Sequence, residues 1–284
     1  MRAKVGANDL VASSRVTGDS YHRHRHGSSY RMTMTEHPSR LTSQQHWDAS
    51  WANPPRMRLP SRLHIGTRDR LRLLASNVRP GDRFLELGCA PGKILAYVRA
   101  VLHADVSGID YSPQGIAWAR RLFNALGIEG DLRCEDLSSI SLPPSSFDVV
   151  HSAGLIEHFS NPESIVALHM HLLRPGGKAL ITIPNLNGFY LPLANHFSPH
   201  LVQAHNLSIM NTQALLNLVP ARSTSEATAT PFGHIGPDLI QFGRRWPYSV
   251  AACSAAALNL LGLLQPFTVP ALAPYLLLRI VKNT

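Results

Sequence analysis

Cysteine is scarce in this sequence, and the few cysteines form no motif. The chain of 284 residues contains Cys89, Cys134 and Cys253, with no CxxC pair among them. Thiols so few and so far apart give neither a disulfide framework nor a cysteine cluster for a metal ion. No apolar segment of signal-peptide length follows the basic residues near Met1 either. We therefore expect a cytoplasmic protein with reduced cysteines and no metal centre.

Charged residues are absent between Arg245 and Arg279. The proline-free part of this segment, residues 248–265, is 18 residues long, which is the lower limit for a membrane span. It is rich in alanine and includes two serines, an asparagine and a glutamine, and prolines interrupt the residues that follow. We predict a helix packed on the protein. Peripheral contact with a membrane or a lipid substrate through residues 246–278 is the second interpretation, and a true span is the third.

An excess of negative charge is also lacking, and the positive charge is unevenly placed. The formal net charge is +9, with 14 basic and 5 acidic residues in residues 1–80 and 13 of each in residues 81–284. A basic patch would favour nucleic acid as a partner. Because residues 81–284 are neutral overall, their charge argues against recognition of nucleic acid by that part.

Residues 1–45 show no sustained apolar period. Their richness in Ser, Arg, His and Gly is typical of a solvated, disordered tail, which is what we predict. Residues 21–26, with the sequence YHRHRH, leave two other interpretations open. The three histidines could capture a metal ion, or the segment could tether the chain to an anionic surface.

Two segments with distinct features precede the first predicted strand. Trp47 and Trp51 either pack over a ligand cleft or form a surface that docks on another molecule. Residues 61–77 predict a helix with Ser61 as its N-cap and Leu63 on its apolar side. The arginines of this helix are expected to form a solvated face, and binding of an anionic partner is their alternative role.

One stretch carries a strand, a glycine-rich turn and a helix. Residues 84–87 predict a buried strand, and a helical pattern begins at Lys93. Gly88 and Gly92 let the backbone turn sharply and approach a ligand closely, because neither carries a Cβ atom. The first N–H groups of the helix point into the same crevice. These features are those of the first unit of a dinucleotide-type α/β fold.

Strand and helix patterns alternate after this unit. Strands are predicted over residues 104–110, 131–134, 147–152 and 178–183, and helices over residues 93–102, 113–126 and 162–173. Repeated strand–helix units imply a parallel sheet with ligands at the carboxyl ends of its strands.

Several blocks along residues 78–185 resemble those of one enzyme family. The turn at residues 86–92 reads ELGCAPG, whereas a dinucleotide fingerprint reads G-x-G-x-x-G. Together with FDVV at 147–150, EHF at 157–159 and LRPGG at 173–177, it resembles class I S-adenosylmethionine-dependent methyltransferases of the type 11/12 small-molecule kind. Ala90 departs from the pattern, which usually has glycine there.

The resemblance implies the fold class and the domain organisation. The fold class is α/β, with a Rossmann-like, seven-stranded, mostly parallel sheet, helices on both faces and antiparallel edge strands at 227–230 and 275–281. The methyltransferase domain would span residues 46–284. Its parts would be a core at 78–185, an insertion at 186–222, and a C-terminal helix with edge strands at 223–284.

The resemblance also implies which residues bind S-adenosylmethionine. Glu86 would face the amino end of the methionine part, Asp110 would bind the ribose, and Asp136 with Leu137 would hold the adenine. The full set of expected cofactor-binding residues is Glu86, Gly88, Cys89, Ala90, Gly92, Asp110, Tyr111, Asp136, Leu137 and Ser152.

Methyl transfer is an in-line displacement, which needs a general base only if the acceptor must lose a proton. His158 is the candidate base, and a structural hydrogen bond is its alternative role. We expect a small acceptor with an apolar, lipid-like body that is methylated on oxygen, because the insertion has the aromatic character of a lid. The histidines of the insertion, His196, His200 and His205, match no zinc-site spacing.

Two other classes of function stay open at this point. One is an RNA or protein methyltransferase that is recruited by the basic N-terminal region. The other is a non-catalytic protein that binds an adenosine ligand, which the departure at Ala90 supports. An NAD-dependent enzyme fits less well, because the glycine spacing differs.

Overall fold

The computed structural model describes residues 39–284, so the tail expected at residues 1–38 lies outside the described residues. The folded part begins earlier than the expected boundary at residue 46. Thr42 is buried, and Arg40 forms an isolated β-bridge with Phe159. Residues 39–45 therefore pack against the domain and do not belong to a tail.

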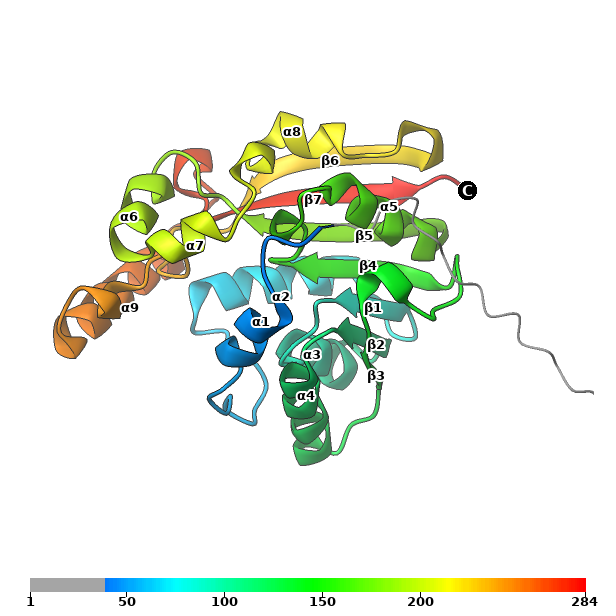
Figure 1. Cartoon of the computed structure of the whole chain (residues 1–284), viewed down its shortest axis with the longest axis horizontal. Coiled ribbons are helices and arrows are strands. Elements are labelled where there is room, and N and C mark those ends of the chain that lie inside the picture. Colours follow the sequence, from blue (N-terminus) through cyan, green and yellow to red (C-terminus); the bar gives the residue numbers. More distant parts are fainter. Residues whose placement is uncertain (1–38) are drawn as a thin grey trace, which may run out of the picture.

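Seven strands form a single sheet in the order β3-β2-β1-β4-β5-β7-β6 (Figure 1). The first five strands pair in parallel, whereas β7 is antiparallel to both β5 and β6. The predicted mostly parallel, Rossmann-like fold with an antiparallel edge is confirmed. The strands are β1 Arg83–Leu87, β2 Asp105–Asp110, β3 Asp131–Cys134, β4 Phe147–Ala153, β5 Leu173–Pro184, β6 Thr224–Phe232 and β7 Tyr275–Lys282.

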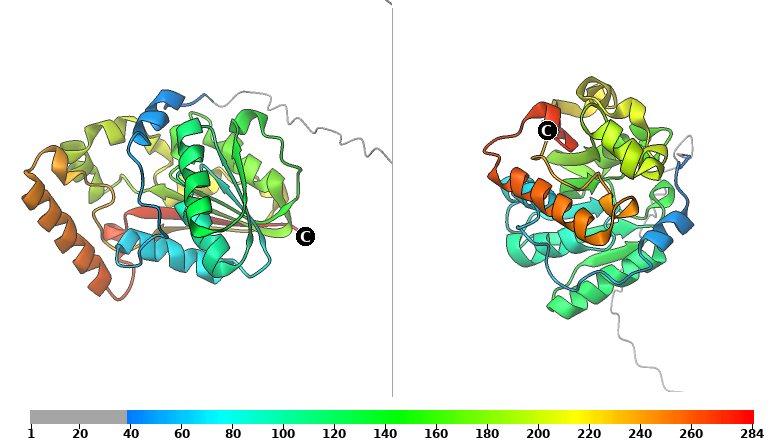
Figure 2. Two further views of the ribbon diagram at one scale, coloured as in Figure 1. Left: turned by 90° about the horizontal axis from the view of Figure 1, so that it is seen from below. Right: turned by 90° about the vertical axis from the view of Figure 1, so that its left-hand side faces the viewer.

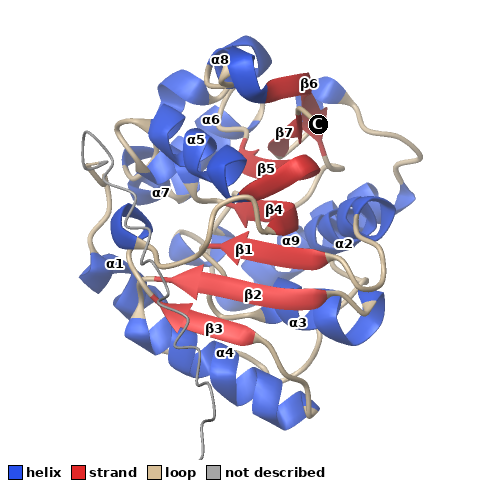
Figure 3. Cartoon of the chain, turned by 90° about the vertical axis from the view of Figure 1, so that its right-hand side faces the viewer, coloured by secondary structure: helices blue, strands red, loops and turns tan. Residues whose placement is uncertain are grey.

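Helices cover both faces of the sheet (Figure 3). Successive residues of a strand point to opposite faces, so Phe84 and Val149 pack with α2, α3 and α4, while Leu85 and Val150 pack with α5. Both faces are therefore apolar, as a buried parallel sheet requires. The helices are α1 Gln44–Ser50, α2 Ile65–Asn77, α3 Lys93–Leu102, α4 Pro113–Leu126, α5 Pro162–Leu172, α6 Tyr190–Phe197, α7 Pro199–Gln203, α8 Thr212–Asn217 and α9 Tyr248–Leu264.

Helix α2 begins four residues later than predicted. Its first residue is Ile65, and Leu63, which was expected on the apolar side, is 77% exposed. The N–H of Ile65 donates to the Oδ1 atom of Asn259, which lies in α9 (2.8 Å). A contact with a distant helix thus satisfies the first N–H group of α2, and Ser61 does not cap it.

Strand β5 begins at Leu173, five residues before the predicted start. Leu173 pairs with Phe147, yet Lys178 pairs with Val149. Four residues of β5, 174–177, are therefore accommodated opposite one residue of β4. Gly176 in this bulge has a φ of 72°, which favours glycine.

Helix α9 stands at one end of the molecule (Figure 2). Only two of its residues, Ala251 and Gly262, are buried. The predicted packed helix is therefore only loosely packed: it approaches the body along α2 and at Gly262, where a Cβ atom would lie 2.0 Å from the carbonyl oxygen of Ile235. Within residues 39–284, no helix is long and apolar enough to cross a bilayer.

Candidate active site

A cavity of about 370 Å³ lies at the carboxyl ends of β1, β2 and β4. Ligands of parallel α/β sheets bind at this edge. Seven of the residues predicted to bind the cofactor line it: Glu86, Gly88, Cys89, Ala90, Asp110, Tyr111 and Leu137.

The glycine-rich turn shapes the floor of the cavity. Gly92 has a φ of 84°, and a Cβ atom there would lie 2.7 Å from the Cβ atom of Ala119 in α4. A Cβ atom at Gly115, also in α4, would lie 2.5 Å from the Cβ atom of Ala90. The methyl group of Ala90 therefore fits because position 115 has no side chain. The departure from the family pattern is accommodated by packing on α4.

Asp110 holds the turn while it faces the cavity. Its Oδ2 atom accepts a hydrogen bond from the N–H of Ala90 (3.1 Å), and its Oδ1 atom accepts one from the N–H of Ser112 (2.9 Å). Burial raises the pKa of the Asp110 carboxyl, and the two N–H groups oppose that rise. The end of β2 thus presents a carboxylate to the cavity in a fixed orientation.

Two opposite charges that form no ion pair with each other line another part of the cavity wall. Glu86 is 4% exposed, and its Oε2 atom has no hydrogen-bond partner among the described residues. The other oxygen, Oε1, lies 3.4 Å from Nδ1 of buried His151. Arg70 of α2 lines the same cavity, close enough to Glu86 for their charges to interact.

Arg70 was missed in the sequence, where the arginines of this helix were assigned to a solvated face. Its Nε–H donates to the carbonyl of Gly66 (3.2 Å), and its guanidinium lies over the ring of Tyr275. Within residues 39–284, no carboxylate lies at ion-pair distance from it. The available signal was its position four residues after Gly66, a buried residue on the same side of the helix.

Three predicted residues lie outside the cavity lining: Gly92, Asp136 and Ser152. The hydroxyl group of Ser152 is buried and lies 3.0 Å from Nε2 of His169.

Asp136 accepts two hydrogen bonds from the guanidinium of Arg40, at 2.6 and 2.7 Å. Burial would raise the pKa of Asp136, but hydrogen bonds from Arg40 and Ser138 lower it to about 2. Its carboxylate is thus already engaged.

Residues 39–51, which we call the N-terminal strap, cover the cavity. Four of them line it: Arg40, Thr42, Trp47 and Trp51. Two hydrogen bonds fix the strap. The Nε2–H of Gln44 donates to the carbonyl of Tyr111 after β2, and the indole N–H of Trp118 in α4 donates to the carbonyl of Trp51. Of the two interpretations of the tryptophans, packing over the cleft is the one observed.

The insertion at 186–222 lies elsewhere than predicted. Among the described residues, none from the insertion lines the cavity. It instead packs behind His158, whose Nδ1 atom lies 2.9 Å from the carbonyl oxygen of Ala204. The strap takes the covering position that we expected for the insertion.

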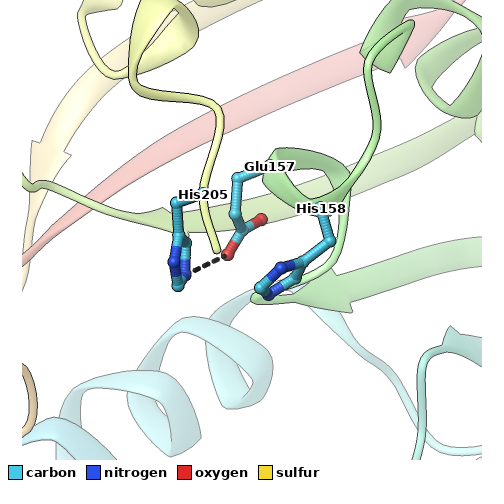
Figure 4. Close-up of side chains that lie close together, drawn as sticks. All are labelled: Glu157, His158 and His205. Atoms are coloured by element: carbon cyan, nitrogen blue, oxygen red, sulfur yellow. Dashed lines mark ion pairs between the residues drawn. The ribbon is translucent and has the colours of Figure 1, made fainter. Parts of the chain in front are cut away.

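His158 lines the cavity next to Trp47, with 5.0 Å between the ring centroids. Burial, followed by the nearby His205, lowers the pKa of His158 to about 3, so its ring is neutral. Behind it, burial raises the pKa of Glu157 to about 8. Figure 4 shows Glu157, His158 and His205 facing one another at the junction of the insertion and the sheet.

Comparison with known proteins agrees with this geometry. The family model described as "Methyltransferase domain" matches residues 85–181. A ubiquinone biosynthesis O-methyltransferase of Xanthomonas axonopodis pv. citri is 30% identical over 141 residues, which are 49% of this chain and 56% of that protein. The chain thus matches only about half the length of this curated relative.

Solved structures show the same fold at low sequence identity. Phosphoethanolamine N-methyltransferase 2 of Haemonchus contortus, in complex with S-adenosylhomocysteine, has a TM-score of 0.56 at 17% identity, covering 85% of this chain and 58% of that chain. The cyclase SpnF has a TM-score of 0.51 at 17% identity, and the match covers 87% of this chain and 97% of the SpnF chain. Residues 85–181 thus match a methyltransferase domain, and the chain shares the fold of these solved structures.

Proposed function

We propose that the chain transfers the methyl group of S-adenosylmethionine to a hydroxyl group of a small acceptor with an apolar body. The observation that carries this proposal is the pair of opposite charges, Glu86 and Arg70, in one wall of the cavity. The amino acid end of the cofactor carries an ammonium and a carboxylate group. Glu86 would accept from the ammonium group, and Arg70 would donate to the carboxylate group.

The rest of the cofactor follows the sheet edge in this proposal. Asp110 would accept hydrogen bonds from the ribose hydroxyls, and Leu137 would contact the adenine. The Arg40–Asp136 pair would close the strap beside the ring. An adenine contact from Asp136 itself, as expected from the sequence, requires Arg40 to release it.

Methylation of oxygen is supported by the similarity to the ubiquinone biosynthesis O-methyltransferase and by apolar side chains near His158. Leu155, Phe159 and Trp47 line that part of the cavity. In the reaction, a bond forms between the acceptor oxygen and the methyl carbon as the sulfur–carbon bond breaks. S-adenosylhomocysteine leaves, and the hydroxyl proton passes to water or to a neighbouring group. The protein contributes by aligning the two reactants and excluding water.

The test begins with mass spectrometry of the purified chain, in which we expect copurified S-adenosylmethionine or S-adenosylhomocysteine. The chain is then incubated with methyl-labelled cofactor and a panel of phenols and alcohols with and without alkyl tails. We expect label in the products of apolar phenols. Label found only in RNA or protein would contradict the proposal, and binding without transfer to any acceptor would favour the non-catalytic class.

We also propose that α9 contacts an anionic membrane surface, which suits an apolar acceptor. Its exposed apolar side chains continue beyond its end, since Leu264 is 71% and Phe267 is 68% exposed. No acidic residue follows Asp238 in the sequence, while Arg244 and Arg245 directly precede the helix. Apolar side chains next to basic residues are typical of segments that lie on anionic bilayers.

Vesicle flotation tests this contact. We expect the chain to float with phosphatidylglycerol vesicles, and the Leu260→Ser/Leu261→Ser/Leu264→Ser variant to bind about tenfold or more weakly. Val101→Ser, which changes a 44% exposed side chain on α3, serves as a control and should bind normally. Equal flotation of the triple variant and the unaltered chain would contradict the contact through α9.

A further inference from the structure

Three side chains able to bind a metal ion meet behind the cavity wall (Figure 4). Glu157 and His158 belong to the 3₁₀ turn Ile156–His158, which follows β4, and His205 follows α7. One nitrogen or oxygen atom from each lies within 4.8 Å of the others, and Nε2 of His205 is 3.8 Å from Oε1 of Glu157. Atoms bound to one tetrahedral ion at the usual bond lengths lie about 3.4 Å apart. The three side chains therefore have to move closer together to bind one ion.

Hydrogen bonds fix the tautomer of both histidines. The Nδ1 atom of His158 pairs with the carbonyl oxygen of Ala204, and that of His205 pairs with the carbonyl oxygen of Leu201. A carbonyl oxygen only accepts hydrogen bonds, so each Nδ1 atom carries the proton. Each Nε2 atom is therefore left with a free lone pair. Histidines that bind metal ions are held in the same way, with one nitrogen donating and the other ligating.

Glu157 has no side chain as a hydrogen-bond partner among the described residues. It is fully buried, and the N–H groups of Leu155 and Glu157 itself oppose the rise that burial causes in the pKa of its carboxyl. Within residues 39–284, His205 is its sole ion-pair partner, and that histidine presents a lone pair. A buried carboxylate beside a histidine lone pair is unfavourable unless a proton or a metal ion lies between the two groups, and a metal ion can bind both.

We propose that Glu157, His158 and His205 bind a divalent transition-metal ion, for which Zn²⁺ is the representative. Two imidazoles and one carboxylate are a ligand set that suits zinc. Three protein ligands leave one tetrahedral position for water or for a donor atom of the acceptor. The ion joins the insertion to the end of β4, where the N–H of Asn206 already donates to the carbonyl of Glu157 (2.7 Å).

This inference changes two expectations from the sequence. No metal centre was expected, because the histidines of the insertion have no zinc spacing among themselves. The ligands instead come from two segments that are 47 residues apart and meet only in the folded chain. A nitrogen that binds a metal ion has no free lone pair for a proton, so the role of His158 as a metal ligand replaces its predicted role as a general base.

The experiment uses the full chain, purified without a polyhistidine tag. His22, His24 and His26 of the YHRHRH segment are changed to alanine, which gives a background variant free of that competing site. After treatment with a chelator, the background variant is titrated with Zn²⁺ by calorimetry. We expect binding of one equivalent. His205→Ala and Glu157→Gln in this background should each weaken zinc binding by about 100-fold or more.

His200→Ala is the matched control, because His200 is a histidine of the same insertion outside the cluster. It should bind zinc as the background variant does. Circular dichroism checks the fold of each variant, and zinc should raise the Tm of the background variant but not that of His205→Ala. Absence of zinc binding by the background variant would overturn the proposal, as would undiminished binding by both His205→Ala and Glu157→Gln.

Cobalt provides a readout that needs no substitution in the cluster. Co²⁺ bound by the background variant should give visible absorption bands of a four-coordinate nitrogen and oxygen site, and their absence would also overturn the proposal. Affinity for S-adenosylhomocysteine is measured separately on the metal-free chain. A loss of that affinity would count against the proposed function and not against the metal site.

Discussion

Asp110→Ala is expected to weaken the binding of S-adenosylhomocysteine by about 100-fold or more. A hydrogen bond to a charged group contributes about 1.5–3 kcal/mol, and we propose that this carboxylate accepts two from the ribose. The substitution also removes the acceptor that holds the N–H of Ala90 in the glycine-rich turn. Isothermal titration calorimetry of the two proteins measures the difference directly.

Asp105→Ala is the control for this prediction. Asp105 begins the same strand, β2, but its side chain is 73% exposed and pairs with Arg99 away from the cavity. The affinity of the Asp105→Ala variant for S-adenosylhomocysteine should equal that of the unaltered chain. Thermal unfolding of both variants separates loss of binding from loss of fold. Unchanged affinity in a folded Asp110→Ala variant would remove the assignment of the ribose site.

Arg70→Met and Glu86→Gln are each expected to weaken S-adenosylhomocysteine binding by about 10- to 100-fold. Each substitution removes one charge that we assign to the amino acid end of the cofactor, and nearly preserves side-chain volume. One lost hydrogen bond to a charged group corresponds to that range. Arg72→Met is the control, because Arg72 is an exposed residue of the same helix.

A truncated ligand sharpens this prediction. 5′-Methylthioadenosine keeps the adenosine part of the cofactor but lacks the amino acid end. Its affinity should be unaffected by Arg70→Met and Glu86→Gln, yet reduced by Asp110→Ala. Equal losses for both ligands in Arg70→Met would mean that Arg70 supports the cavity in general and does not bind the carboxylate group.

The predictable parts of the fold were those set by local signals. Helix α4 has the expected bounds, because Ser112 accepts from the N–H of Gly115 and Gly127 has the positive φ of a helix end. The parallel strands β1 and β4 follow apolar runs between turns. Glu86 and Asp110, which the sequence predicts as cofactor-binding residues, both line the cavity because the fold places the ends of parallel strands at one edge.

The parts that could not be predicted depend on contacts between distant segments. Nothing near residue 61 in the sequence reveals that Asn259 satisfies the N–H of Ile65. The engagement of Asp136 by Arg40 joins segments 96 residues apart. The same holds for the strap, which lies in a stretch without apolar periodicity, and for His205 beside Glu157. Pattern and spacing therefore locate the strand ends that line the cavity, whereas the segments that cover the cavity and pack behind it need three-dimensional information.

The position of β7 has a consequence for biosynthesis. Strand β6 is the outermost strand and pairs with β7 alone, although β7 is translated about forty residues later. While the intervening residues, α9 included, emerge from the ribosome, one edge of β5 and both edges of β6 lack a hydrogen-bonded partner strand. An unpaired strand edge is a template for aggregation. A nascent chain therefore exposes these unpaired edges until β7 has emerged and paired with both strands.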